Sequence, residues 1–153
     1  MPAGLPAREA AVRLIAAVMH ERRALDEALA KEFASSQLQP RDRGLARLIA
    51  STVLRRQGEL EAVLSGYLEK PLPARQGQLW PILLSGAAQL LFLETPPHAA
   101  VGLAVEQARR DRHAHRYDRL VNALLRRLTR EGADALTGRD GIALNIPDWL
   151  LAS

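Results

Sequence analysis

Apolar residues recur along this chain at the spacing of an α-helix, and almost no segment alternates apolar and polar residues as a strand does. Ala11, Leu14, Ile15 and Val18, for example, fall on one stripe of a helix. The same period of about 3.6 residues returns in each long segment between proline and glycine breaks. Strand-like alternation with β-branched residues is nearly absent. The sequence therefore predicts an all-α fold.

The breaks divide the chain into about seven predicted helices. We expect them over residues 6–20, 25–34, 40–56, 60–68, 81–94, 97–112 and 116–131. Gly58 is expected to separate the third helix from the fourth, and Gly132 to end the seventh. The prolines in Lys70–Pro73 exclude a helix there, so this stretch should connect two packed helical halves, about 6–68 and 77–131.

Neither half is long enough to bury a core alone, so we expect a single domain over residues 1–153. A tail, 132–153, follows the second half, and Ile146–Leu150 could form one helical turn in it. The uncharged run Gln76–Leu93 approaches the length of a membrane span but contains glutamines and a proline. We interpret it as the central buried helix, and we expect no membrane partner.

The composition excludes several kinds of chemistry. The chain has no cysteine, which rules out a thiol nucleophile, a Cys-ligated zinc site and an iron–sulfur cluster on these residues. No catalytic triad, P-loop or glycine-rich dinucleotide turn is present. We therefore expect no cofactor and no catalysis from this chain alone. The start of the chain does not resemble an export signal, and a cytoplasmic location is expected.

Positive charge is concentrated late in the chain. Nineteen of the 21 basic residues are arginine, whose planar fork suits phosphate. Between residues 109 and 130, eight arginines stand against Asp111 and Asp118. This segment predicts contact with an anionic partner, RNA or DNA, through Arg109, Arg110, Arg112, Arg116, Arg119, Arg126, Arg127 and Arg130. The alternative is that many of them only complement helix C-termini, where cations are favoured.

The predicted last helix has one packing face and one basic face. Arg119, Arg126 and Arg130 fall within about 40° of one another on a helical wheel. Asn122, among apolar neighbours, is expected to tie down nearby backbone. His113 and His115 form an H-x-H pair, which we interpret as part of a solvated loop beside a phosphate site rather than as metal ligands.

Five strings then match a known family in order. They are Arg41–Arg55, Lys70–Leu72, Leu83–Leu91, Pro96–Val101 and, above all, Val121–Arg127. Together they resemble NusB-like domains, and more closely the N-terminal NusB-like domain of the RsmB (Sun/Fmu) family of small-subunit rRNA cytosine-C5 methyltransferases. The resemblance extends roughly from Pro6 to Trp149.

The resemblance implies an all-helical bundle of two packed subdomains that helps to bind ribosomal RNA. It also implies that the first helix contributes basic residues, here Arg8 and Arg13. In that family a C-terminal methyltransferase domain, absent from this chain, binds S-adenosylmethionine and supplies the catalytic cysteines. A freestanding NusB-type antitermination factor, which binds RNA and a protein partner, is the alternative. A module that only packs against a catalytic domain is a third.

Overall fold

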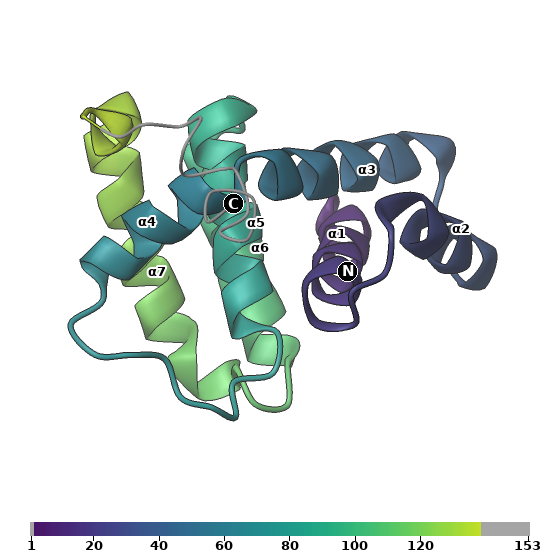
Figure 1. The fold of residues 1–153 in the computed structure, drawn as a ribbon, viewed down its shortest axis with the longest axis horizontal. Helices are drawn as coiled ribbons and strands as arrows, with labels where there is room; N and C mark the ends of the chain where they lie inside the picture. Colours follow the sequence, from purple (N-terminus) through teal and green to yellow (C-terminus); the bar gives the residue numbers. More distant parts are fainter. Residues whose placement is uncertain (1, 139–153) are drawn as a thin grey trace, which may run out of the picture.

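The computed structural model describes residues 2–138, and these are almost entirely helical (Figure 1). The α-helices are α1 (Leu5–His20), α2 (Leu25–Ser35), α3 (Pro40–Arg55), α4 (Gln57–Tyr67), α5 (Leu79–Phe92), α6 (Pro97–Arg110) and α7 (Asp118–Glu131). Two 3₁₀ turns, η1 (His115–Tyr117) and η2 (Gly132–Leu136), flank α7. The described residues contain no strand, which confirms the all-α prediction.

Most helix boundaries follow the predicted proline and glycine signals. Pro40 and Pro97 are the first residues of α3 and α6, where a missing backbone N–H costs nothing. Gly132, with φ of 55°, ends α7 as predicted. The prediction that Gly58 separates the third helix from the fourth is wrong, because the chain turns at Arg56 and Gly58 lies in the first turn of α4. Glycine costs only about 1 kcal/mol relative to alanine within a helix, so a single glycine does not by itself end one.

The helices form two groups that share one hydrophobic core (Figure 1). Helices α1, α2 and α3 pack together, while α4 packs against α5, and α7 packs against α5 and α6. Helix α4, which precedes the Lys70–Pro73 connector, thus packs against α5, which follows it. The reason is that α4 buries Leu60, Val63 and Leu64, and Trp80 Nε1 at the start of α5 donates a hydrogen bond of 3.2 Å to Glu61 Oε2.

Helix α5 is the centre of the bundle, as its uncharged sequence predicted. Every residue from Pro81 to Gln89 is buried. Gly86 lets α7 approach closely, because a Cβ at Gly86 would lie 2.6 Å from Leu125 Cδ1. Ala7 and Ala11 of α1 and Ala46 of α3 are also fully buried. Helices α1 and α3 pack against each other, and small side chains allow such a close approach.

Within residues 2–138 there is no helix with the length and apolar character needed to cross a bilayer. The predicted turn at Ile146–Leu150 lies outside the described residues.

Candidate nucleic-acid interface

The turn between α6 and α7 is organised by one carboxylate. Asp111 Oδ1 accepts hydrogen bonds of 2.9 Å from the backbone N–H groups of His113 and Ala114. Its Oδ2 accepts one of 3.1 Å from the backbone N–H of Gln78, just before α5. An aspartate that bonds backbone two and three residues ahead is a common turn former. Asp111 therefore fixes the turn and also attaches it to the start of α5.

Gly77 makes that attachment sterically possible. Its φ of +59° is the left-handed conformation that glycine adopts most readily. A Cβ at this position would overlap the Asp111 carboxylate. The close approach of the α4–α5 connector to the α6–α7 turn thus depends on a glycine at 77.

Four arginines surround this turn, and two of them are already paired. Arg109 Nε lies 3.0 Å from Asp118 Oδ2, and Arg110 Nε lies 3.3 Å from Glu9 Oε2 on α1. The hydrogen bond from Arg109 lowers the pKa of the Asp118 carboxyl below its usual 3.8.

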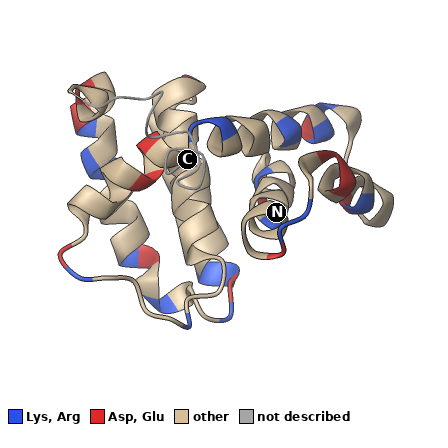
Figure 2. Ribbon diagram, in the orientation of Figure 1, with Lys and Arg blue, Asp and Glu red and all other residues tan. Residues whose placement is uncertain are grey.

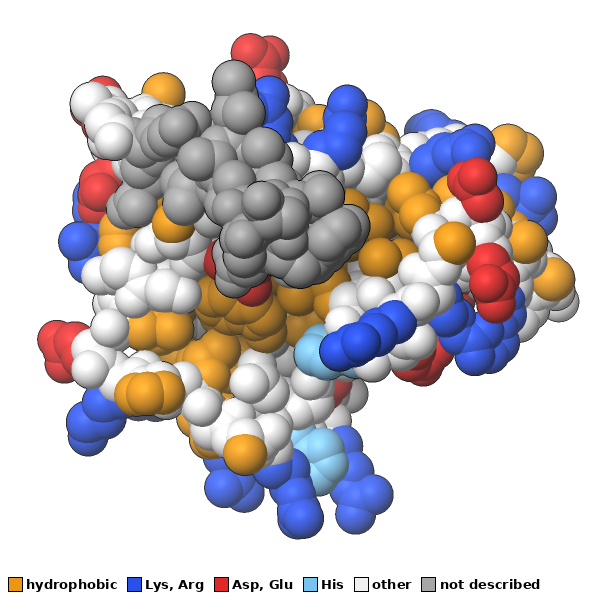
Figure 3. Space-filling model, in the orientation of Figure 1, with side chains coloured by type: hydrophobic (Ala, Val, Ile, Leu, Met, Phe, Trp, Pro, Cys, Tyr) orange, Lys and Arg blue, Asp and Glu red, His pale blue; other side chains and the backbone are white. Residues whose placement is uncertain are grey.

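The other two arginines of the turn, Arg112 and Arg116, are exposed, and no described carboxylate lies within 4.0 Å of them. In Figure 3, Lys or Arg and His side chains gather at the lower end of the molecule, where α6 ends and α7 begins. The turn therefore presents positive charge that the described protein does not neutralise.

A second group of arginines lies on the outer face of α7. Arg119, Arg126 and Arg130 are exposed, and the opposite face buries Val121, Leu125 and Leu128. Asn122 Oδ1 accepts a hydrogen bond of 3.0 Å from Arg126 Nε, so it positions a side chain rather than the backbone it was expected to tie down. We call Arg119, Arg126 and Arg130 the α7 ridge. No ion pair within 4.0 Å among residues 2–138 involves its members, although the charges of Arg119 and Arg130 contribute to lowering the pKa of the Asp118 and Glu131 carboxyls.

Arg127, next to the α7 ridge, is held by the protein itself. Its guanidinium lies 4.0 Å from the centroid of the Tyr67 ring on α4, and its Nε lies 2.8 Å from Glu131 Oε2. Hydrogen bonds from Arg127 and Tyr67 lower the pKa of the Glu131 carboxyl. These contacts give Arg127 a role in joining α4 to α7.

The two arginines of the first helix differ in their accessibility. Arg8 is only 7% exposed; its Nε donates a 2.7 Å hydrogen bond to Gln89 Oε1 on α5, and its Nη1 donates to Gly4 O. Burial lowers its pKa. Arg13 is half exposed but lies 2.6 Å from Glu32 Oε1 on α2. Arg8 thus joins α1 to α5, and Arg13 joins α1 to α2.

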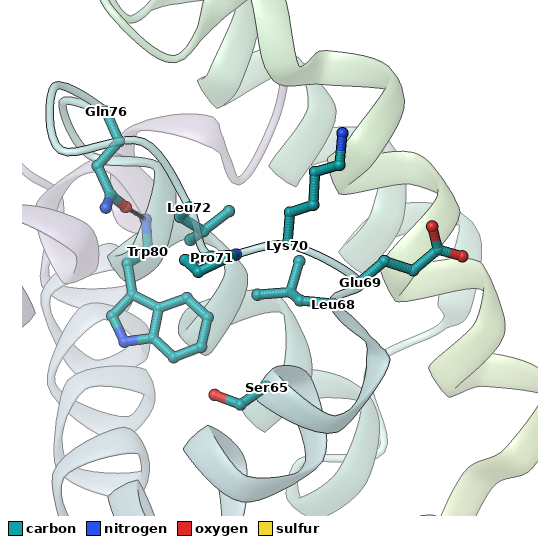
Figure 4. A pocket seen from close by; sticks show the side chains of 8 residues that line it. All are labelled: Ser65, Leu68, Glu69, Lys70, Pro71, Leu72, Gln76 and Trp80. Carbon is teal, nitrogen blue, oxygen red and sulfur yellow. Dashed lines mark hydrogen bonds between the residues drawn. The ribbon is translucent and has the colours of Figure 1, made fainter.

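A groove of about 720 Å³ runs between the 68–73 connector and α7, and it is continuous with the α7 ridge through Arg130. Tyr67, Tyr117 and Leu120 contribute to its walls. On the other side of the connector lies a second pocket of about 470 Å³, shown in Figure 4. The Trp80 ring, Leu68, Pro71 and Leu72 face it, while Glu69 and Lys70 extend away.

His113 is half-buried and His115 is exposed on η1. Across the described part of the chain, no three His, Asp or Glu side chains come together as a metal site would require. Both histidines lie in the same turn as Arg112 and Arg116.

The sequence reasoning missed the role of Asp111, which entered only as a charge that offset arginines. Its spacing from His113 and Ala114 was the available signal, since an aspartate before a short loop often bonds backbone two or three residues on. The contact with Gln78, 33 residues away, has no local signal.

Comparison with known proteins defines the class of this helical bundle. The model of the NusB family matches residues 5–130, so the chain belongs to the NusB family. Its relatives include proteins named ribosomal RNA small subunit methyltransferase B. The one from Xanthomonas campestris is 40% identical over 151 residues, which is 97% of this chain and 32% of that protein.

Two further relatives of the same name agree. The Vibrio cholerae protein is 40% identical over 121 residues, covering 77% of this chain and 28% of its own length. The Pseudomonas putida protein is 35% identical over 147 residues, covering 94% of this chain and 33% of its own length. This chain therefore spans about a third of the length of the relatives it matches.

Proposed function

We propose that this chain is the RNA-binding, N-terminal domain of a small-subunit rRNA cytosine-C5 methyltransferase. The observation that carries the proposal is the set of exposed arginines that form no ion pair within 4.0 Å among the described residues, on the α7 ridge and the α6–α7 turn, in a NusB-family domain. The methyltransferase assignment is supported by the names of the relatives and by the share of their length that is matched.

In this proposal the domain binds the RNA substrate, and the rest of the longer protein carries out methyl transfer. Arg112, Arg116 and the α7 ridge hold the phosphates of ribosomal RNA, and a methyltransferase domain outside this chain binds S-adenosylmethionine. The chain contains no cysteine, so it offers no thiolate to attack a cytosine ring. Its contribution is to position the RNA substrate. We propose that this takes place in the cytoplasm.

The predicted contact residues divide into those that pair with a carboxylate, those that form no such pair, and Arg8, which is buried. Arg109, Arg110, Arg127 and Arg13 already pair with carboxylates, so a phosphate would have to compete for them. Arg8 is buried, and we leave it out of the proposed contact surface. Arg112, Arg116, Arg119, Arg126 and Arg130 are therefore the proposed phosphate contacts.

The test is binding of the chain to a hairpin transcript of small-subunit rRNA, compared between the parent and the double variant Arg126→Ala with Arg130→Ala. We expect weaker binding at unchanged helical content, because both side chains are exposed on one helix face. The matched control is Arg22→Ala with Lys31→Ala, which removes two exposed cations from the α1–α2 region.

Equal binding by the α7 variant and the control would show that these arginines serve only their helix. Binding that requires an added protein partner would favour the antitermination alternative. If the parent chain binds no RNA at low salt, a module that only packs against a catalytic domain would be the better account.

A further inference from the structure

The outer face of α3 carries a second row of arginines, in the other helix group. Arg41, Arg47 and Arg55 are exposed, and the buried residues Ile49, Ala50 and Val53 lie on the opposite side. Figure 2 shows Lys or Arg along much of α3, with one acidic residue in its first turn, Asp42. From Arg41 to Arg55 the row is about 21 Å long, at 1.5 Å per residue. We call Arg41, Arg47 and Arg55 the α3 row.

Three carboxylates on the helices next to α3 make contacts elsewhere, and Asp42 of α3 itself forms no ion pair with the row among the described residues. Glu32 of α2 pairs with Arg13, and Glu59 of α4 pairs with Arg56. Glu61 of α4 accepts hydrogen bonds from Gln57 and Trp80. In the described part of the protein no carboxylate lies within 4.0 Å of the α3 row. Its positive charge is thus available to an external anion.

Helix-end electrostatics do not explain this row. Arg41 is the second residue of α3, where the positive end of the helix dipole disfavours a cation, and Arg47 lies in the middle of the helix. Only Arg55 is in the last turn. This differs from Arg109, Arg110 and Arg130, which lie in the last turns of α6 and α7.

The chemistry of the face favours an RNA backbone over a protein. Gly44 and Ser51 lie on the same face, and a Cβ at Gly44 would meet nothing within 4 Å. Among the described residues, Leu48 is the one large apolar side chain that is exposed, at 45%. Leu48 lines a hollow of about 400 Å³ with Phe92 and Leu93, next to Arg55 and Arg56. Because Phe92 and Leu93 are half-buried, the face lacks the central cluster of exposed apolar or aromatic anchors that a protein interface of useful affinity needs. Spaced arginines over small residues suit a line of phosphates.

We propose that the α3 row is a second RNA-contact surface, which holds the phosphate backbone of RNA beyond the segment bound at the α7 ridge. This inference rests on the proposed RNA-binding function. The RNA contact would then extend over both helix groups, α1–α3 and α4–α7. The bound RNA would be longer than a single hairpin stem.

The experiment measures affinity against salt concentration with a small-subunit rRNA transcript that carries a hairpin and single-stranded flanks. The variant is Arg41→Gln with Arg47→Gln, because glutamine keeps helix propensity and removes charge. Each phosphate contact with single-stranded RNA contributes about 0.7 to the slope of log K against log salt. We expect the slope to fall by about 1.4. The control, Arg22→Gln with Lys31→Gln, should leave the slope unchanged.

A second readout reports where the RNA lies on the protein rather than how tightly it binds. A photo-crosslinking side chain at Ser51, on the face of the α3 row, should attach to the RNA flank, and the same group at Ser65 on α4 should not. Circular dichroism and the unfolding temperature confirm that each variant is folded.

The outcomes separate this inference from the proposed function. If the α3 variant behaves like its control and Ser51 does not crosslink while Arg126→Ala with Arg130→Ala still weakens binding, the α3 row is not an RNA surface and the proposed function stands. If the α3 variant keeps its RNA slope but loses binding to the methyltransferase part of the longer protein, the face is a protein interface. If the parent binds no RNA, both proposals are wrong.

Discussion

The junction between Asp111 and Gly77 gives a prediction whose size follows from the geometry. Asp111 accepts three hydrogen bonds from backbone N–H groups, at 2.9, 2.9 and 3.1 Å. A hydrogen bond contributes about 1 kcal/mol net, so Asp111→Ala should cost about 3 kcal/mol of unfolding free energy. At roughly 2–4 °C per kcal/mol for a domain of this size, the unfolding midpoint should fall by about 6–12 °C.

Gly77→Ala should disturb the same contact from the other side. The residue would be held at φ of +59°, which costs about 1–2 kcal/mol for a residue with a Cβ, and that Cβ would overlap the Asp111 carboxylate. When Asp111 is already alanine the overlap disappears and only the backbone cost remains. The two changes should therefore be less than additive, with a coupling energy of about 1–2 kcal/mol.

The assay is chemical denaturation of the parent, both single variants and the double variant. Additive costs would show that Asp111 and Gly77 do not act through a shared contact, and a loss below about 1 kcal/mol for Asp111→Ala would show that water replaces its hydrogen bonds. RNA affinity should fall with Asp111→Ala, because the turn that carries Arg112 and Arg116 loses its support.

Three more predictions concern the fold and its charges. Arg8→Met should lower stability by about 1–3 kcal/mol in denaturation yet leave RNA affinity unchanged, because the side chain is buried; a specific loss of affinity would place Arg8 in the interface. Arg109→Gln should raise the pKa of Asp118 toward its usual 3.8 in an NMR titration. Because that pKa is lowered in the folded state, ionised Asp118 stabilises the parent above about pH 3.8, and this stabilisation is lost as the pH falls. In the variant the unfolding free energy should therefore depend less on pH in this range. An unchanged pKa of Asp118 would contradict the assigned cause. Gly86→Ala should lower the unfolding free energy by about 1–3 kcal/mol, because the new Cβ would clash with Leu125. The loss should be smaller when Leu125 is replaced by alanine, and an equal loss in both backgrounds would exclude the clash as its cause.

Helices and their ends could be predicted because their causes are local. Proline at the first position of α3 and α6, glycine after α7 and the uncharged run of α5 are each visible within a few residues. The grouping of helices was harder. Whether α4 belongs with α3 or α5 depends on contacts between distant residues, such as Trp80 with Glu61 and Arg127 with Tyr67.

The sequence predicted which residues make up the candidate site but not which of their side chains are accessible. Eight arginines in one segment are visible in the sequence, but which of them are neutralised depends on partners from other helices. Arg110 pairs with Glu9, 101 positions earlier, and Arg8 turns inward to Gln89. The α3 row was not predicted, because the net charge was summed over all residues outside 109–130, where the acidic residues of α2 and α4 offset the arginines of α3.

The most direct test of RNA binding by this domain is the salt dependence of its affinity for small-subunit rRNA. Five proposed contacts, Arg112, Arg116, Arg119, Arg126 and Arg130, predict a slope of log K against log salt of about −3.5 if all meet single-stranded phosphates, and a steeper one if the α3 row also binds. A slope near zero, or an affinity equal to that of the variant lacking Arg126 and Arg130, would contradict the account.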